Sequence, residues 1–145
     1  VLKMLLDALL LVLFGSALSS VINFFLSSQG QISAVGTIVS SGYGFICGAY
    51  MPISNFSAGL QKVLSFLPGT YGTSLLRNHA LAGVFREMER IGLPAELLKG
   101  VRDSIDCNLY FFSSPVSESG MYAIMLAGIA VLLGVYVALN ALKRR

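Results

Sequence analysis

Few side chains in this sequence have the type and spacing that chemistry requires. His79 is the only histidine, and no cysteine or carboxylate stands at ligand spacing from it, so we interpret it as an interfacial hydrogen-bonding residue. Cys47 and Cys107 lack metal-ligand spacing, and we expect free thiols. The glycine-rich stretch GTYGTS at 69–74 lacks the lysine of a phosphate-binding loop. The sequence therefore predicts no catalytic, metal or cofactor site, and we expect that the chain is not an enzyme.

One carboxylate deserves separate treatment because it lies within an apolar stretch, where an ionisable residue is a functional candidate by default. Asp7 is four residues from Lys3 and close to the end of the apolar stretch at 4–26. This position favours an interfacial ion pair between Asp7 and Lys3. The alternative is a role of Asp7 in proton coupling.

The composition is typical of a membrane protein. Of the 145 residues, 55% are hydrophobic and 12% are charged, whereas soluble proteins have about 25% charged residues. The net charge is +3, but three of the ten basic residues lie together at 143–145, and no basic stripe interleaved with aromatic residues occurs elsewhere. We therefore expect a bilayer and no nucleic acid as partner. No signal-peptide pattern follows Val1, and we expect a chain that begins partway through a larger protein.

Three stretches are long enough to cross a hydrocarbon core of about 30 Å, which needs roughly 20 helical residues. They lie at 4–26, 32–51 and 119–142. Small residues recur at helical spacing in the second and third stretches, which lets another helix approach closely. Such stripes are common in multi-spanning proteins, and the alternative is that the Ser/Thr side of the second stretch lines a polar route. The helix-packing residues predicted from these stripes are Ser41, Gly44, Gly48, Ala127 and Gly134.

The distribution of basic residues predicts the orientation. The cluster at 143–145 directly follows the last span and favours a cytoplasmic C-terminus. The connection at 52–118 holds six basic residues, but it exceeds the roughly 60 residues over which the positive-inside rule applies reliably. Three spans then place the turn at 27–31 in the cytoplasm and the long connection outside. We expect a multi-pass protein of the plasma membrane.

The first part of that connection, at about 55–76, is apolar but interrupted by Pro68 and Gly69. It predicts two short helices, and we expect Gly69 to use the positive φ that glycine allows at a turn. Non-helical backbone is tolerated at membrane depth only where protein or a water-filled cavity surrounds it. We therefore interpret this part as a re-entrant helix pair at the outer mouth of a pathway. The alternative is a helical hairpin on the outer membrane surface.

The second part of the connection, at about 77–118, predicts an amphipathic helical segment outside the membrane. Lys99 with Asp103 and Arg102 with Asp106 have the i,i+4 spacing of helical ion pairs. Such exposed pairs stabilise a helix by only about 0.3 to 0.5 kcal/mol, so we expect these charges to be structural.

Several of these stretches together resemble the C-terminal half of the transmembrane permease subunit of a type-2 ATP-binding-cassette (ABC) exporter. They are GYGFICGAYMPISNF at 42–56, LQKVLSFLPGTYGTSLLRN at 60–78, LYFFSSPVSES at 109–119 and the final helix that ends in KRR. The resemblance implies the last three of six helices, with re-entrant helices before the sixth. It also implies a second permease subunit, like or unlike, and a separate ATPase subunit that holds ATP and Mg. The transported substrate does not carry over.

We therefore expect an all-α integral membrane protein in which residues 1–145 form a single partial transmembrane domain. This domain would have three transmembrane helices, a re-entrant helix pair and an extracellular amphipathic helical segment. Its expected function is to form part of the translocation path and outer gate of an ATP-driven exporter. The alternative is a non-transporting multi-spanning scaffold or assembly subunit, which would use the small-residue stripes for packing alone. The path or gate residues predicted from position are Tyr43, Phe45, Tyr50, Pro52, Pro68 and Gly69.

Overall fold

The computed structural model describes residues 1–111 and 114–143. The described chain is helical apart from turns and one two-stranded pair, which confirms the predicted all-α class. The elements are α1 (Leu2–Asn23), α2 (Gln29–Ile46), the 3₁₀ helix η1 (Ile53–Asn55), α3 (Ala58–Leu64), α4 (Pro68–Ala80), α5 (Ala82–Arg90), α6 (Ala95–Ser104), β1 (Tyr110–Phe111), β2 (Ser114–Pro115) and α7 (Glu118–Lys143).

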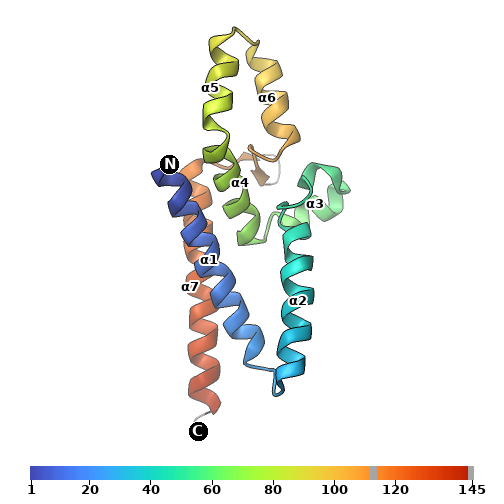
Figure 1. The fold of residues 1–145 in the computed structure, drawn as a ribbon, viewed down its shortest axis with the longest axis vertical. Helices are drawn as coiled ribbons and strands as arrows, with labels where there is room; N and C mark the ends of the chain where they lie inside the picture. The colour runs from blue at the N-terminus through green and yellow to red at the C-terminus, as the bar shows by residue number, and fades with distance from the viewer. Residues whose placement is uncertain (112–113, 144–145) are drawn as a thin grey trace.

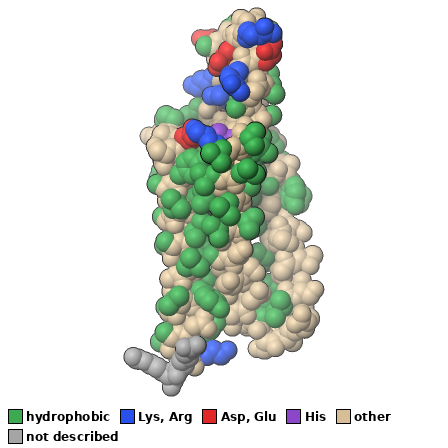
Figure 2. Space-filling model, turned by 60° about the vertical axis from the view of Figure 1, so that its left-hand side comes forward, with side chains coloured by type: hydrophobic (Ala, Val, Ile, Leu, Met, Phe, Trp, Pro, Cys, Tyr) green, Lys and Arg blue, Asp and Glu red, His purple; other side chains and the backbone are tan. Residues whose placement is uncertain are grey.

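The helices α1 and α7 are long and apolar enough to cross a membrane. Large aliphatic side chains cover their outer sides and stay exposed; Val12 is 63% exposed and Val137 is 64% exposed. Figure 2 shows hydrophobic side chains along the length of this face, whereas most of the charged side chains that it shows gather at the α5–α6 end. Such a contiguous apolar surface on a folded chain marks contact with lipid or with another protein.

The core lies between α1, α4 and α7, which form a three-helix bundle (Figure 1). Tyr71 and Leu75 on α4 are buried against apolar side chains of α1 and α7, among them Phe14 and Met125. Gly72 makes this close packing feasible, because a Cβ there would lie 2.6 Å from the Leu11 side chain. The short helix α4 is therefore enclosed by the two long helices.

The helix α2 stands apart from the bundle and has no buried residue (Figure 1). A capping box of Ser28 and Gln31 begins it. A Schellman motif ends it at Ile46, with Gly48 at φ +81° and the Ala49 N–H donating to the Gly44 carbonyl. The predicted span to residue 51 is thus too long by five residues, and α2 is not among the helices apolar enough to be recognised as spans.

The broken apolar segment forms α3 and α4, and Pro68 begins α4 at the position where its missing N–H is harmless. Gly69 lies within the first turn of α4 and has no positive φ; among the described glycines only Gly48 and Gly92 do. The expectation of a positive φ at Gly69 is therefore wrong, because the chain bends at Leu67, in extended conformation, before the helix starts.

The amphipathic segment forms a hairpin of α5 and α6 that extends beyond the bundle (Figure 1). Gly92, at φ +78°, allows the turn between the two helices. The helix α6 ends at Ser104, and Asp106 then takes a positive φ of 54°. The antiparallel pair β1–β2 follows and leads into α7.

Candidate functional site

The predicted gate region lies at the N-terminal end of α4, where α2 meets the bundle. The Gly69 N–H donates to the Tyr43 hydroxyl at 3.3 Å, and the Tyr43 ring lies against Phe14 with ring centroids 5.8 Å apart. A Cβ on Gly69 would lie 2.6 Å from the Tyr43 hydroxyl oxygen. Gly69 therefore matters as the surface on which Tyr43 rests, and this contact joins α2 to the bundle.

On the other side of α4, Pro68 rests on the backbone of α7. A Cβ on Gly128 would lie 2.6 Å from Pro68 Cγ, so the proline ring occupies the space that a side chain would need. Gly128 is not among the packing residues predicted from the small-residue stripe. Ala127 and Gly134, which were predicted, are exposed in this chain, and Gly134 has open space where a Cβ would be. Their role in packing stays a prediction.

A network that we call the Arg77–Asp106 clasp ties two loops to α4. Arg77 donates from Nη2 to the Gly48 carbonyl at 2.6 Å and from Nη1 to the Ile105 carbonyl at 2.5 Å. The Asp106 carboxylate accepts the backbone N–H groups of Ile53 and Ser54. The clasp therefore holds the end of α2 and the end of α6 on one helix.

Burial raises the pKa of the Asp106 carboxyl from its ordinary value, although the backbone donors at Ile53 and Ser54 and the nearby Arg77 oppose the rise. The positive φ of Asp106 is uncommon outside glycine, but aspartate tolerates it better than most residues. This residue had been expected to pair with Arg102 along a helix. That expectation is wrong, because the helix ends first and long-range backbone donors take the carboxylate.

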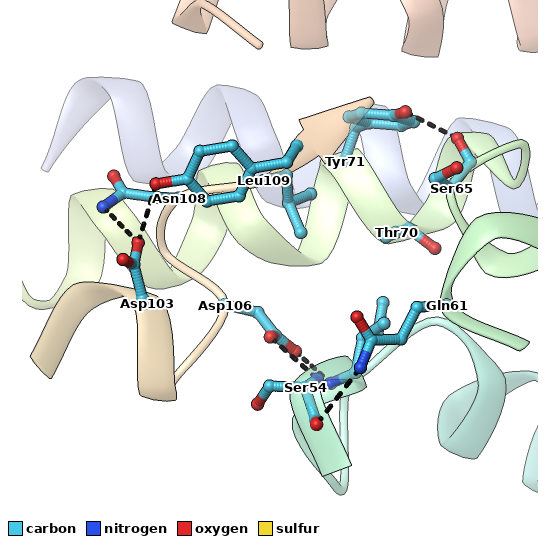
Figure 3. A pocket seen from close by; sticks show the side chains of 11 residues that line it. Ser54, Gln61, Ser65, Thr70, Tyr71, Asp103, Asp106, Asn108 and Leu109 are labelled. Carbon is cyan, nitrogen blue, oxygen red and sulfur yellow. Dashed lines mark hydrogen bonds between the residues drawn. The ribbon is translucent and has the colours of Figure 1, made fainter. Parts of the chain in front are cut away.

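A pocket of about 240 Å³ lies beside the clasp, between α3, α4 and the end of α6. Figure 3 shows the Asp106 carboxylate directed at Ser54, and the Asp103 carboxylate directed at Asn108. Asp103 accepts from Asn108 Nδ2 at 2.8 Å and from the Tyr110 hydroxyl at 3.2 Å. Both carboxylates of this pocket therefore already have donors within the chain.

At the other end of α4, three helices meet around a buried carboxylate. The Asp7 side chain is fully buried; its Oδ2 lies 2.5 Å from His79 Nδ1, and its Oδ1 accepts the Tyr122 hydroxyl at 2.6 Å. The predicted ion pair between Asp7 and Lys3 is absent: Lys3 Nζ instead lies 2.8 Å from Glu118 Oε1. Partners from α4 and α7 take the carboxylate, because Asp7 faces the bundle interior. His79 is thus a hydrogen-bonding residue, as the sequence indicated, and its position at a membrane interface stays a prediction.

The remaining predicted residues lie around the end of α2. Phe45 and Tyr50 are exposed and stack edge to face with ring centroids 5.1 Å apart, while the Tyr50 ring covers Gly44. Pro52 is half-buried and begins η1. Their role in a path or gate stays a prediction.

Two of the predicted packing glycines lie near the C-terminal end of α2. Gly44 lies under the Tyr50 ring, and Gly48 lies beyond the end of α2, next to Ile53 and Asp106. Gly48 therefore serves the turn and the clasp, and its predicted place within a helix is wrong. Ser41 is exposed on α2. The signal for Gly48 was in the sequence, since a glycine just beyond an apolar helix commonly ends it in a left-handed conformation.

A groove of about 290 Å³ lies between α1 and α2. Its lining combines the small or polar residues Gly15, Ser19, Gly36 and Ser40 with the larger side chains of Leu18, Ile22, Val39 and Tyr43. The small residues of α2 thus border open space here, whereas a tightly packed helix interface would have filled that space. Cys47 and Cys107 are free and buried.

Comparisons with protein-family models, with curated proteins and with solved structures found no match for this chain. The resemblance to ABC permeases therefore stays a prediction that depends on the quoted stretches.

Proposed function

We propose that the chain is the membrane-spanning permease part of an ATP-driven type-2 ABC exporter and forms part of its translocation path and outer gate. The observation that carries the proposal is the pair α3–α4, a broken apolar segment whose second helix is enclosed by the two long apolar helices α1 and α7. A hairpin lying on a membrane surface would expose one side of α4 to lipid or water. Here every residue of α4 except Ala80 is buried or half-buried, and Tyr71 and Leu75 are each only 1% exposed.

In this proposal α2 also spans the membrane, in addition to α1 and α7, although it is less apolar than those two helices. Its residues Ser40 and Tyr43 border the groove between α1 and α2, and we assign that groove to the path. A span that borders a water-filled route need not be apolar on every side, which accounts for its serine and glycine content. Lys143 follows the apolar part of α7 and supports a cytoplasmic C-terminus. The α5–α6 hairpin then lies outside the cell.

The gate in this proposal is the contact of Tyr43 with Gly69, together with Pro68 on Gly128. It joins α2, which has no buried residue, to the packed bundle. An ATPase on a separate chain would close on ATP and Mg, and a second permease subunit would complete the path. Rocking of the two permease subunits would then change the separation of α2 from α1, and Tyr43 would follow.

The proposal is tested by isolating the chain's native complex. The protein is tagged in its native membrane, cross-linked, purified in detergent and analysed by mass spectrometry, with an unrelated tagged multi-spanning protein as control. We expect a P-loop ATPase in comparable amounts that is absent from the control, and ATP hydrolysis by the purified complex. Recovery of other membrane proteins without any ATPase would reject the exporter proposal and support a scaffold or assembly subunit.

A further inference from the structure

A larger pocket, of about 740 Å³, lies where the bundle meets the α5–α6 hairpin, and the proposed function does not use it. Its charged wall is mostly basic: Lys3, Lys99 and Arg102 line it together with His79, and Glu118 is the carboxylate among its described lining residues. We call it the basic pocket. Its lining comes from α1, α4, α5, α6, α7 and the β1–β2 pair, so it exists only in the folded chain.

The carboxylate in the basic pocket is already engaged. Glu118 Oε1 lies 2.8 Å from Lys3 Nζ and 3.3 Å from His79 Nε2. The sequence suggested Asp103 and Asp106 as partners for Lys99 and Arg102. Both carboxylates instead accept hydrogen bonds on the side of the smaller pocket (Figure 3). Among the described residues, no ion pair within 4.0 Å involves Lys99 or Arg102. In the described part of the chain, Lys99 and Arg102 therefore have no carboxylate within ion-pair distance.

The contacts of the Arg102 guanidinium favour the binding of an anion. Its guanidinium carbon lies over the buried Phe85 ring, 4.5 Å from the ring centroid, so the cation is held by a cation–π contact. Its Nε is buried and has no hydrogen-bond partner in the described part of the chain. Buried polar groups normally have partners, and a guanidinium held against an aromatic ring can present its remaining N–H groups to the oxygens of a phosphate or a carboxylate.

The basic pocket also lies at the boundary of the apolar surface. Lys3 and Glu118 belong to the first turns of α1 and α7, the two helices apolar enough to cross a membrane. Leu75, Val116 and Met121 also line it. An occupant there would meet both cations and apolar side chains. This arrangement suits an anionic head group attached to an apolar tail.

We propose that the basic pocket binds a phosphate group, held by Arg102 and Lys99, and that the group belongs to an anionic lipid whose chains lie along α1 and α7. A soluble phosphate ester offers the same oxygens, and the experiment separates the two sources. The inference is independent of the proposed transport function, since the binding is measured without an ATPase.

The test uses the purified chain in nanodiscs of phosphatidylcholine, into which phosphatidylglycerol is titrated. Native mass spectrometry counts retained lipids, and calorimetry with glycerol 3-phosphate measures the soluble ester. We expect selective retention of phosphatidylglycerol, reduced about tenfold in affinity by Arg102→Gln and by Lys99→Gln, since each removes one charge-assisted contact. The matched control is Arg86→Gln, which removes the same charge from an exposed position of α5 that does not line the pocket.

The two arms distinguish the sources of the phosphate. Retention of phosphatidylglycerol with weak binding of glycerol 3-phosphate assigns a lipid, whereas equal affinities assign a soluble phosphate compound. Thermal melts of each variant show whether the fold is kept. Equal effects of Arg102→Gln and Arg86→Gln in folded protein would mean that only overall charge attracts the lipid, and the proposal would be abandoned. The same holds if the parent chain shows no preference over phosphatidylcholine.

Discussion

His79 Nδ1 lies 2.5 Å from Asp7 Oδ2, and this contact joins the end of α4 to the buried side of α1. The two residues are 72 positions apart, and Tyr122 on α7 binds the second oxygen of the same carboxylate at 2.6 Å. One buried carboxylate thus receives a partner from each of the other two bundle helices. We infer that this cluster fixes the relative positions of α1, α4 and α7 at the end where the hairpin begins.

Removal of the histidine should therefore destabilise the bundle. His79→Ala leaves a buried carboxylate with one partner fewer, and we expect a loss of about 3 kcal/mol in the free energy of unfolding, measured by denaturation of the purified chain in detergent. The double variant His79→Ala with Asp7→Asn should lose less, because no buried charge is left. A loss below about 0.5 kcal/mol in His79→Ala would contradict a structural role of the pair.

The contact between Tyr43 and Gly69 makes a second prediction. Gly69→Ala should push Tyr43 away and cost about 1 to 3 kcal/mol in the free energy of unfolding, as overpacking does. The matched control is Gly59→Ala on α3, where a Cβ has open space and alanine favours the helix. Tyr43→Ala should restore most of the stability of Gly69→Ala. If Gly69→Ala is as stable as Gly59→Ala, the predicted close approach is absent.

A third prediction compares a tightly packed glycine of α7, Gly128, with an open one, Gly134. A Cβ on Gly128 would meet the rigid ring of Pro68, whereas Gly134 has open space. We expect Gly128→Ala to lower the melting temperature of the purified chain and Gly134→Ala to leave it unchanged or raise it. A change at Gly134 equal to that at Gly128 would indicate that Gly134 packs against another subunit, as its place in the stripe first suggested.

Local pattern was sufficient to predict the long helices at the two ends of the chain. The predicted spans at 4–26 and 119–142 match α1 and α7 to within three residues, because uninterrupted apolar runs have few alternatives to a helix. The predicted end of α2 was wrong by five residues. There the chain is still apolar after Gly48, and only the backbone conformation at the glycine ends the helix.

The partners of the buried carboxylates were predicted less well than the long helices, and the reason is physical. The sequence suggests neighbours at four residues, such as Lys3 for Asp7 or Arg102 for Asp106. An exposed pair of this kind contributes little, so any partner from another element prevails once the side chain is buried. Asp7 and Asp106 both find partners more than 50 residues away. Such long-range contacts depend on the tertiary fold, which the local pattern does not specify.

The buried Asp106 carboxyl makes the fourth prediction, which concerns pH. Burial raises its pKa above the ordinary value of 3.8. At a pH between the ordinary pKa of the unfolded chain and the raised pKa of the folded chain, the folded chain keeps a proton that the unfolded chain has released. The free energy of unfolding therefore decreases as the pH rises from the first pKa through the second. Asp106→Asn does not titrate, but its amide cannot accept both backbone N–H groups, which costs about 1 to 3 kcal/mol.

The stability of the parent chain relative to Asp106→Asn should therefore be greatest at acidic pH and decrease as the pH rises. Denaturation series of both proteins between pH 4 and pH 7 measure the difference. Glu89→Gln on the exposed face of α5 gives the baseline for removal of a carboxylate. A difference that is constant with pH, or that grows with rising pH, would show that the carboxyl titrates at or below its ordinary value.

The last prediction concerns orientation and uses the burial of the native thiols. Cys107 is only 2% exposed, and burial raises the pKa of its thiol, so it should react slowly with a membrane-impermeant maleimide even if its loop faces the medium. An introduced cysteine is needed, and Gly100→Cys on α6 and Gly30→Cys at the start of α2 both fall on exposed positions with open space for a side chain.

With the C-terminus in the cytoplasm, intact cells should show labelling of Gly100→Cys, while Gly30→Cys should be labelled only after the cells are opened. The unsubstituted chain supplies the background from Cys47 and Cys107. Labelling of Gly30→Cys alone in intact cells would reverse the orientation, and labelling of both would mean that α2 does not cross the membrane, leaving two spans in place of three.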